Sequence, residues 1–119
     1  MVRLSEIAFG SATPIDGYGP NFFRVAGEVM EGAVIVTATG ARPWRGYADT
    51  APLLALQEKI DFLLLGTGAG ITYPPVAFRE ALDAVGIGVE PMASPVAARS
   101  YNVLLSEGRR IAAALLPVG

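Results

Sequence analysis

The stretch "LLLGTGAGITYPP", residues 63–75, places three glycines within five positions directly after an apolar run. An apolar run of this kind is typical of a strand that is buried on both faces of a sheet. The glycines that follow have two interpretations. They form either a loop that holds a phosphate group or a tight turn that lets the strand leave its sheet.

The spacing of the glycines argues against a nucleotide site. A dinucleotide-binding loop has the pattern G-x-G-x-x-G with a helix that begins inside the motif, whereas Gly66, Gly68 and Gly70 follow G-x-G-x-G. The next helix is not expected before Pro74, and the prolines remove backbone donors from its start. No Gly-Lys-Ser/Thr follows either, as a phosphate-binding P-loop would need. We therefore favour the tight strand exit, in which glycines permit positive φ angles.

Similar apolar runs predict the rest of a central sheet. Together with "DFLLLG" (61–66), the runs "AVIVTATG" (33–40) and "GIGVEPM" (86–92) indicate three central strands. The segment 109–116 is expected to form a last strand. Residues upstream of 33 predict short β segments, namely "IAFG" (7–10) and "FFRVAGEVM" (22–30) around a loop "PIDGYGPN" (14–21), with Phe23, Val25 and Val29 facing the core.

Helical spacing appears between the central strands. Thr50 is predicted to cap a helix, Pro74 and Pro75 to begin a second, and Ser94 to cap a third that ends before Gly108. The residues expected on the buried faces of the first two helices are Leu53, Leu56, Ile60, Phe78, Ala81, Leu82 and Val85. On the third, Arg99, Asn102 and Ser106 are assigned to a polar side, although a packed Tyr101 beside a hydrogen-bonded Asn102 is also expected. This order predicts an α/β domain over residues 1–119, around a mostly parallel sheet with an N-terminal β-hairpin region.

The composition excludes several classes of site. The 119 residues contain no cysteine and no histidine, which removes disulfides, thiolate nucleophiles, Ser-His-Asp triads and imidazole metal sites. The net charge is -2 and the nine basic residues are scattered, so no nucleic-acid surface is expected. No signal-like start and no bilayer-length apolar stretch are present, which predicts a soluble cytoplasmic protein. We expect no catalytic residue set, no metal and no cofactor.

Candidate binding residues lie near two predicted strand ends. The side chains of Arg42, Trp44, Arg45, Thr67 and Tyr73 are expected to line one cleft, together with Gly66 and Gly68, if strands 33–40 and 61–66 are neighbours. Arginine and tryptophan dominate protein interfaces, and arginine also binds anions. The alternative is that Trp44 only covers the sheet end and the arginines are solvated.

The order of several motifs resembles a known family. The segments "DGYGPNFFRVAG", "GAVIVTATGARPW", "DFLLLGTG" and "ARSYNVLLSEGRRIAAALLPV" resemble the domain family of unknown biochemical function that includes the mitochondrial complex I assembly factor 3 proteins and the adipogenesis-associated Mth-type domain proteins. The resemblance implies three layers around a mixed sheet whose final strand runs antiparallel to the others. It also implies protein partners, among them respiratory-complex subunits or assembly factors, and it supplies no catalytic residue to carry over.

Three functional hypotheses remain open at this point. The leading one is a non-enzymatic binding protein that helps the respiratory NADH dehydrogenase assemble, through a surface with residues 42–45 and the loop after Gly66. The rival is a small-anion or metabolite-binding protein, or an enzyme, in which Arg45 holds the anion beside Thr67 or Tyr73. The third is a homo-oligomer subunit, with Phe22, Phe23 and Met30 at the subunit contact.

Overall fold

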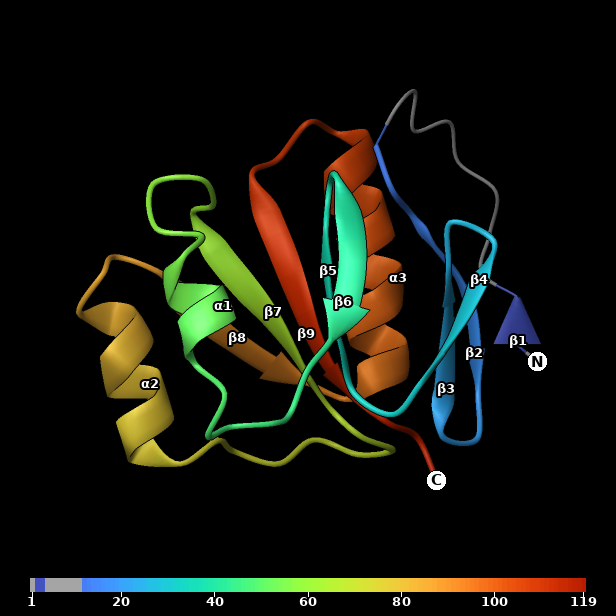
Figure 1. Cartoon of the computed structure of the whole chain (residues 1–119), viewed down its shortest axis with the longest axis horizontal. Helices are drawn as coiled ribbons and strands as arrows, with labels where there is room; N and C mark the ends of the chain where they lie inside the picture. Colours follow the sequence, from blue (N-terminus) through green and yellow to red (C-terminus); the bar gives the residue numbers. More distant parts are fainter. Residues whose placement is uncertain (1, 4–11) are drawn as a thin grey trace.

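The computed structural model describes residues 2–3 and 12–119. Within these residues the chain forms two sheets and three helices (Figure 1). The small sheet has the order β1-β2-β3-β4, with strands Val2–Arg3, Ile15–Gly19, Phe22–Val25 and Glu28–Glu31. The large sheet has the order β6-β5-β9-β7-β8, with strands Gly40–Pro43, Val34–Thr37, Ile111–Leu116, Phe62–Thr67 and Gly88–Met92. The helices are α1 (Ala51–Leu54), α2 (Val76–Asp83) and α3 (Ser94–Ser106).

The large sheet is mixed, and four of its five strands run in one direction. β7 pairs in parallel with both β8 and β9, while β5 is antiparallel to β6 and to β9. The predicted mixed, mostly parallel sheet is therefore confirmed, but the expectation that the final strand runs against the others is wrong. α3 carries the chain from the end of β8 back to the end of the sheet where β8 begins. The next strand, β9, therefore starts at that end and runs parallel to β8. The reversed strand is β5, because a tight hairpin connects it to β6.

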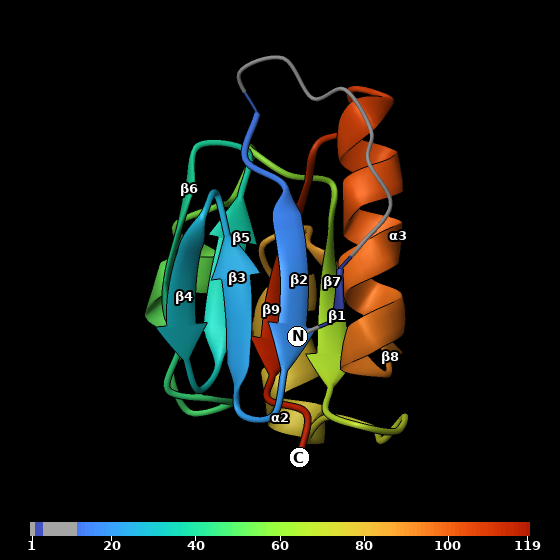
Figure 2. The same cartoon turned by 90° about the vertical axis from the view of Figure 1, so that its right-hand side faces the viewer.

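Two hydrophobic clusters on opposite faces of the large sheet define three layers. Leu63 and Leu65 point to the face covered by α1 and α2, and Leu64 between them points to the other face. α3 and the small sheet cover that second face (Figure 2). Phe23 of β3 is fully buried in this cluster and Met30 packs against it. Burial within one chain thus accounts for Phe23 without a second subunit.

The N-terminal region departs from the sequence prediction in two ways. Residues 15–19, which were expected to be a loop, form β2, because the short backbone ladder with β3 is favourable despite two glycines. The predicted strand 22–30 is interrupted at Ala26 and Gly27, which have φ angles of 50° and 82° and form a turn. Val25 is buried as predicted, but Val29 is 58% exposed on the outer strand β4. The predicted strand 7–10 lies outside the described residues.

The helix boundaries follow the prolines and glycines better than the predicted caps. α2 begins after Pro75, and Gly108 follows α3 with a φ of 76°. α1 has only four residues, and the Thr50 side chain makes no capping hydrogen bond. Ser94 is the first residue of α3 and not its cap, since its hydroxyl is engaged elsewhere.

Asn102 of α3 joins the helix to the small sheet. Its side chain is 3% exposed, so its assignment to a polar helix side is wrong, whereas the expectation of a hydrogen-bonded Asn102 beside a packed Tyr101 is confirmed. The Oδ1 atom accepts a hydrogen bond from the Ile15 amide at 2.9 Å, and Nδ2 donates to the Ile15 carbonyl at 2.8 Å. The neighbouring Tyr101 is fully buried, as expected, and burial raises the pKa of its hydroxyl. This pair therefore belongs to the structural core.

Candidate functional site

Hydrogen bonds within the protein close the glycine loop that follows β7. The Gly68 amide donates to Ser94 Oγ at 2.9 Å, and the Ser94 amide donates to the Gly68 carbonyl at 2.8 Å. Thr67 Oγ1 donates to the Gly70 carbonyl at 2.7 Å and accepts from the Thr72 amide at 3.0 Å. The polar groups of the loop base are therefore directed at the protein itself. The amides of Gly68 and Thr72, which belong to the loop, are both used and cannot donate to a phosphate.

Gly66 lies where two other elements approach the strand most closely. A Cβ atom on this residue would lie 2.6 Å from Ser94 Oγ and 2.7 Å from Leu115 Cδ2. Ser94 is completely buried, and its hydroxyl also donates to the Leu116 carbonyl at 2.6 Å. The serine therefore connects the glycine loop, α3 and β9. Sequence reasoning missed this role because a serine followed by proline after a strand also suits a helix cap.

The far part of the same loop and the first residue of α2 carry exposed apolar side chains. The side chains of Ile71, Tyr73 and Val76 are 57%, 78% and 71% exposed. We call these three residues the apolar loop surface. They account for three of the six large hydrophobic side chains exposed in the described part of the chain. Contiguous exposed apolar patches mark contact sites, and the closeness of these three residues in the sequence makes this segment a candidate for one.

Trp44 is a packing residue near this surface. The indole is 4% exposed, and its ring centroid lies 5.9 Å from that of Tyr47 and 6.1 Å from that of Phe78 on α2. Its Nε1 atom donates to the Asp49 carbonyl at 3.0 Å. The Tyr47 hydroxyl is buried with no partner among the described residues, and burial raises its pKa. Arg45, next to Trp44, is exposed at the end of the sheet where β7 ends.

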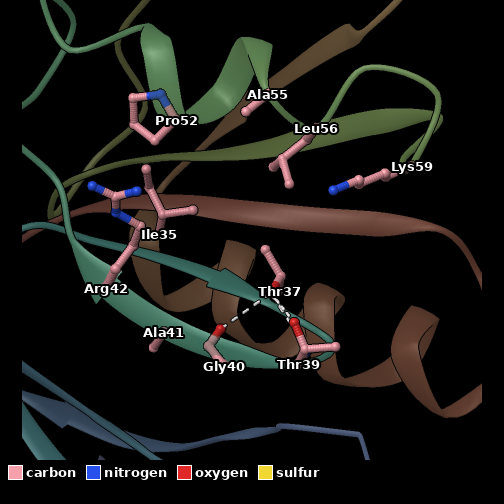
Figure 3. Close-up of a pocket in the computed structure, with 10 residues that line it drawn as sticks. All are labelled: Ile35, Thr37, Thr39, Gly40, Ala41, Arg42, Pro52, Ala55, Leu56 and Lys59. Carbon is pink, nitrogen blue, oxygen red and sulfur yellow. Dashed lines mark hydrogen bonds between the residues drawn. The ribbon is translucent and has the colours of Figure 1, made fainter.

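The structure does not bring the predicted cleft residues together. β9 lies between β5 and β7, so the two strands expected to be neighbours are not adjacent. Arg45 and Tyr73 lie toward one end of the sheet, and Trp44 is covered. Arg42 lies within β6, before the strand ends at Pro43. It lines a separate pocket formed by the β5–β6 hairpin and α1 (Figure 3). Across residues 2–3 and 12–119, no three carboxylates gather as a metal site would require.

A family comparison agrees with this architecture. The profile of the family described as "Protein of unknown function (DUF498/DUF598)" matches residues 15–116. The chain belongs to this family. The match spans both sheets apart from β1, together with all three helices and the glycine loop.

One of the proteins similar in sequence to this chain is named as an assembly factor. An uncharacterised protein of Rhodobacter capsulatus is 52% identical over 95% of this chain and 91% of its own length. The "NADH dehydrogenase [ubiquinone] 1 alpha subcomplex assembly factor 3" of Danio rerio is 32% identical over 98% of this chain and 71% of its own length. The resemblance found in the sequence is thus confirmed at the level of the family.

Solved structures show the same fold. The crystal structure of an outer membrane protein from Bartonella henselae has a TM-score of 0.82 at 32% identity, covering 94% of this chain and all of that one. A Mth938-like domain from Bordetella pertussis has a TM-score of 0.73 at 25% identity, covering 98% and 92% of the two chains. In the described part of this DUF498/DUF598 chain, no helix has the length and apolar character needed to cross a bilayer.

Proposed function

We propose that this protein is a non-enzymatic binding protein that acts in the cytoplasm and takes part in assembling the respiratory NADH dehydrogenase. It contacts a partner protein of that complex through the apolar loop surface and through Arg45, which lies at the end of the large sheet where β7 ends. The name of the Danio rerio relative supports the assembly role. The absence of histidine and cysteine from the whole sequence supports binding over catalysis.

The observation that carries this proposal is the exposure of Tyr73 on a loop with a fixed base. The base is held by the Thr67 and Ser94 hydroxyls, while Tyr73 is 78% exposed. A large side chain presented on a pre-ordered loop loses little conformational entropy when it binds. Tyrosine and arginine are also the side chains that most often dominate interface energies.

Arg45 adds charge to this apolar contact. It is exposed, and the short turn that contains it is held by a hydrogen bond from its own amide to Asp49 Oδ2 at 3.2 Å. The turn packs on α2 through Trp44, Tyr47 and Phe78, and α2 begins at Val76, which is part of the apolar loop surface. We therefore expect the partner to carry an apolar pocket for Tyr73 with an acidic group beside it.

Capture from the host organism tests the proposal. Tagged wild-type protein is expected to recover NADH dehydrogenase subunits or their assembly intermediates from detergent extracts, identified by mass spectrometry. The double variant Arg45→Ala/Tyr73→Ala is expected to lower that recovery by a factor of about 100, since each hot-spot residue contributes about 1–2 kcal/mol. Both side chains are exposed, so the melting temperature is expected to stay within about 2 °C of wild type.

A matched control removes the same kinds of group from another face. Arg99 and Val103 are exposed on α3, and Val103 is 46% exposed. The variant Arg99→Ala/Val103→Ala is expected to recover the same subunits as wild type. If the Arg45→Ala/Tyr73→Ala variant recovered as much as wild type, this surface would be excluded as the contact. If wild type itself recovered no NADH dehydrogenase subunits, the assembly role would be excluded.

A further inference from the structure

A second surface lies away from the apolar loop surface, at the β5–β6 hairpin. The pocket there has a volume of about 320 Å³ and lies between this hairpin on one side and α1 with its following turn on the other (Figure 3). The β5–β6 turn is at the end of the sheet opposite to the end of β7, because β5 runs against β9 and β7. The volume is in the range of small-molecule sites.

Two cationic side chains mark the ends of this pocket. Arg42 lies at one end and Lys59 at the other (Figure 3). Neither forms an ion pair within the described part of the chain. Asp61, two residues after the lysine, is paired with Arg110 at 2.9 Å. The positive charge of both ends is therefore available to a ligand.

The pocket between the two cations is apolar on its floor and one wall. Ile35 on β5 is 2% exposed and is the cross-strand partner of Arg42 on β6, and Leu56 lies beside Lys59 (Figure 3). Hydroxyl groups line the opposite side. Thr37 Oγ1 donates to the Gly40 carbonyl at 3.3 Å, and the Thr37 and Thr39 hydroxyl oxygens are 3.2 Å apart. With the Thr37 proton on Gly40, the Thr39 hydroxyl donates to Thr37 Oγ1, so these hydroxyls form the polar wall and leave the acidic groups of a ligand to the two cations.

We infer that this pocket binds a small organic dianion whose two acidic groups are separated by a short apolar body. One acidic group pairs with the Arg42 guanidinium, which suits a carboxylate in two-point contact, and the other pairs with the Lys59 ammonium. The apolar body lies against the half-buried Leu56, with Ile35 beneath it in the core. This site is independent of the proposed protein contact, because it shares neither residues nor location with the apolar loop surface.

Titration with linear dicarboxylates, from malonate to adipate, tests this inference. The amide signals of Thr37, Thr39 and Gly40 are followed by NMR. At least one member of the series is expected to shift these signals with a Kd of about 1 mM or below. Arg42→Gln and Lys59→Gln are each expected to raise that Kd about tenfold, while Arg99→Gln, which removes an exposed charge elsewhere, leaves it unchanged.

Further ligands test the two ends and the apolar middle separately. Butyrate lacks the second acidic group, and inorganic phosphate lacks the apolar body, so both are expected to bind at least about tenfold more weakly than the best dicarboxylate. No shift with any dicarboxylate up to about 10 mM would overturn the inference. It would equally be overturned by comparable binding of butyrate or phosphate, or by equal weakening in Arg99→Gln.

Discussion

Replacing Asn102 with alanine is expected to lower the free energy of unfolding by about 3 kcal/mol. The substitution removes both hydrogen bonds to Ile15 and leaves a buried amide and a buried carbonyl of that residue without their partner. Each unsatisfied group costs about 1–3 kcal/mol, and the better helix propensity of alanine returns only about 0.6 kcal/mol. In thermal unfolding the melting temperature is expected to fall by about 10 °C.

The control for this prediction is Arg99→Ala, one helical turn earlier on the exposed face of α3. It is expected to change the free energy of unfolding by less than about 0.5 kcal/mol. A similar loss in both variants would indicate that helix α3 is generally sensitive and that Asn102 has no special role. An unchanged stability of Asn102→Ala would show that water replaces the amide contacts.

Gly66→Ala is expected to destabilise the protein by about 2 kcal/mol. The added methyl group would overlap Ser94 Oγ and Leu115 Cδ2, and the Ser94 Cα atom is only 3.0 Å away. The leucine methyl group is able to rotate aside, but the serine hydroxyl is held by Gly68 and Leu116. Chemical denaturation is expected to show a lower midpoint with an unchanged slope.

Gly70→Ala is the matched control within the same motif. A Cβ atom there would meet no atom within 4 Å, and its φ angle is outside the range that favours glycine. This variant is expected to stay within about 0.5 kcal/mol of wild type. If Gly66→Ala proved as stable as Gly70→Ala, close packing would not explain the glycine that follows the apolar run, and the strand-exit account of this loop would lose its main support.

Local signals in the sequence were sufficient to predict several elements. The run 61–66 corresponds to β7, the double proline precedes α2, and Gly108 ends α3 at a positive φ. Each of these depends on a preference of the residue itself or on a periodic apolar face. The assignment to a family with three layers around a mixed sheet also followed from sequence motifs that cover most of the chain.

Strand order and side-chain contacts across the fold were not predictable in the same way. The prediction of one cleft failed because it needed β5 and β7 to be neighbours, and only the complete sheet shows that β9 separates them. Ser94 was predicted to be a helix cap, and Asn102 was predicted on the polar side of its helix, with a hydrogen bond whose partner the sequence did not identify. Their buried roles depend on Gly68 and Ile15, which are 26 and 87 positions away in the chain.

The two arginines of the segment 42–45 illustrate the same limit. Their proximity in sequence favoured a single binding surface, but β6 ends between them at Pro43. Arg42 lines the pocket beside α1, whereas Arg45 lies beyond the strand end. They consequently belong to two separate proposals, which single substitutions distinguish: Arg45→Ala is expected to affect partner capture, and Arg42→Gln to affect dianion binding.

The most direct test of the proposed docking surface is site-specific photocrosslinking in the host cell. A photoreactive phenylalanine analogue is introduced at position 73, and at position 99 of α3 as the control. The proposal predicts that position 73 crosslinks to a subunit or assembly intermediate of the NADH dehydrogenase and that position 99 does not. Equal crosslinking at both positions, or crosslinks from position 73 only to proteins unrelated to that complex, would contradict it.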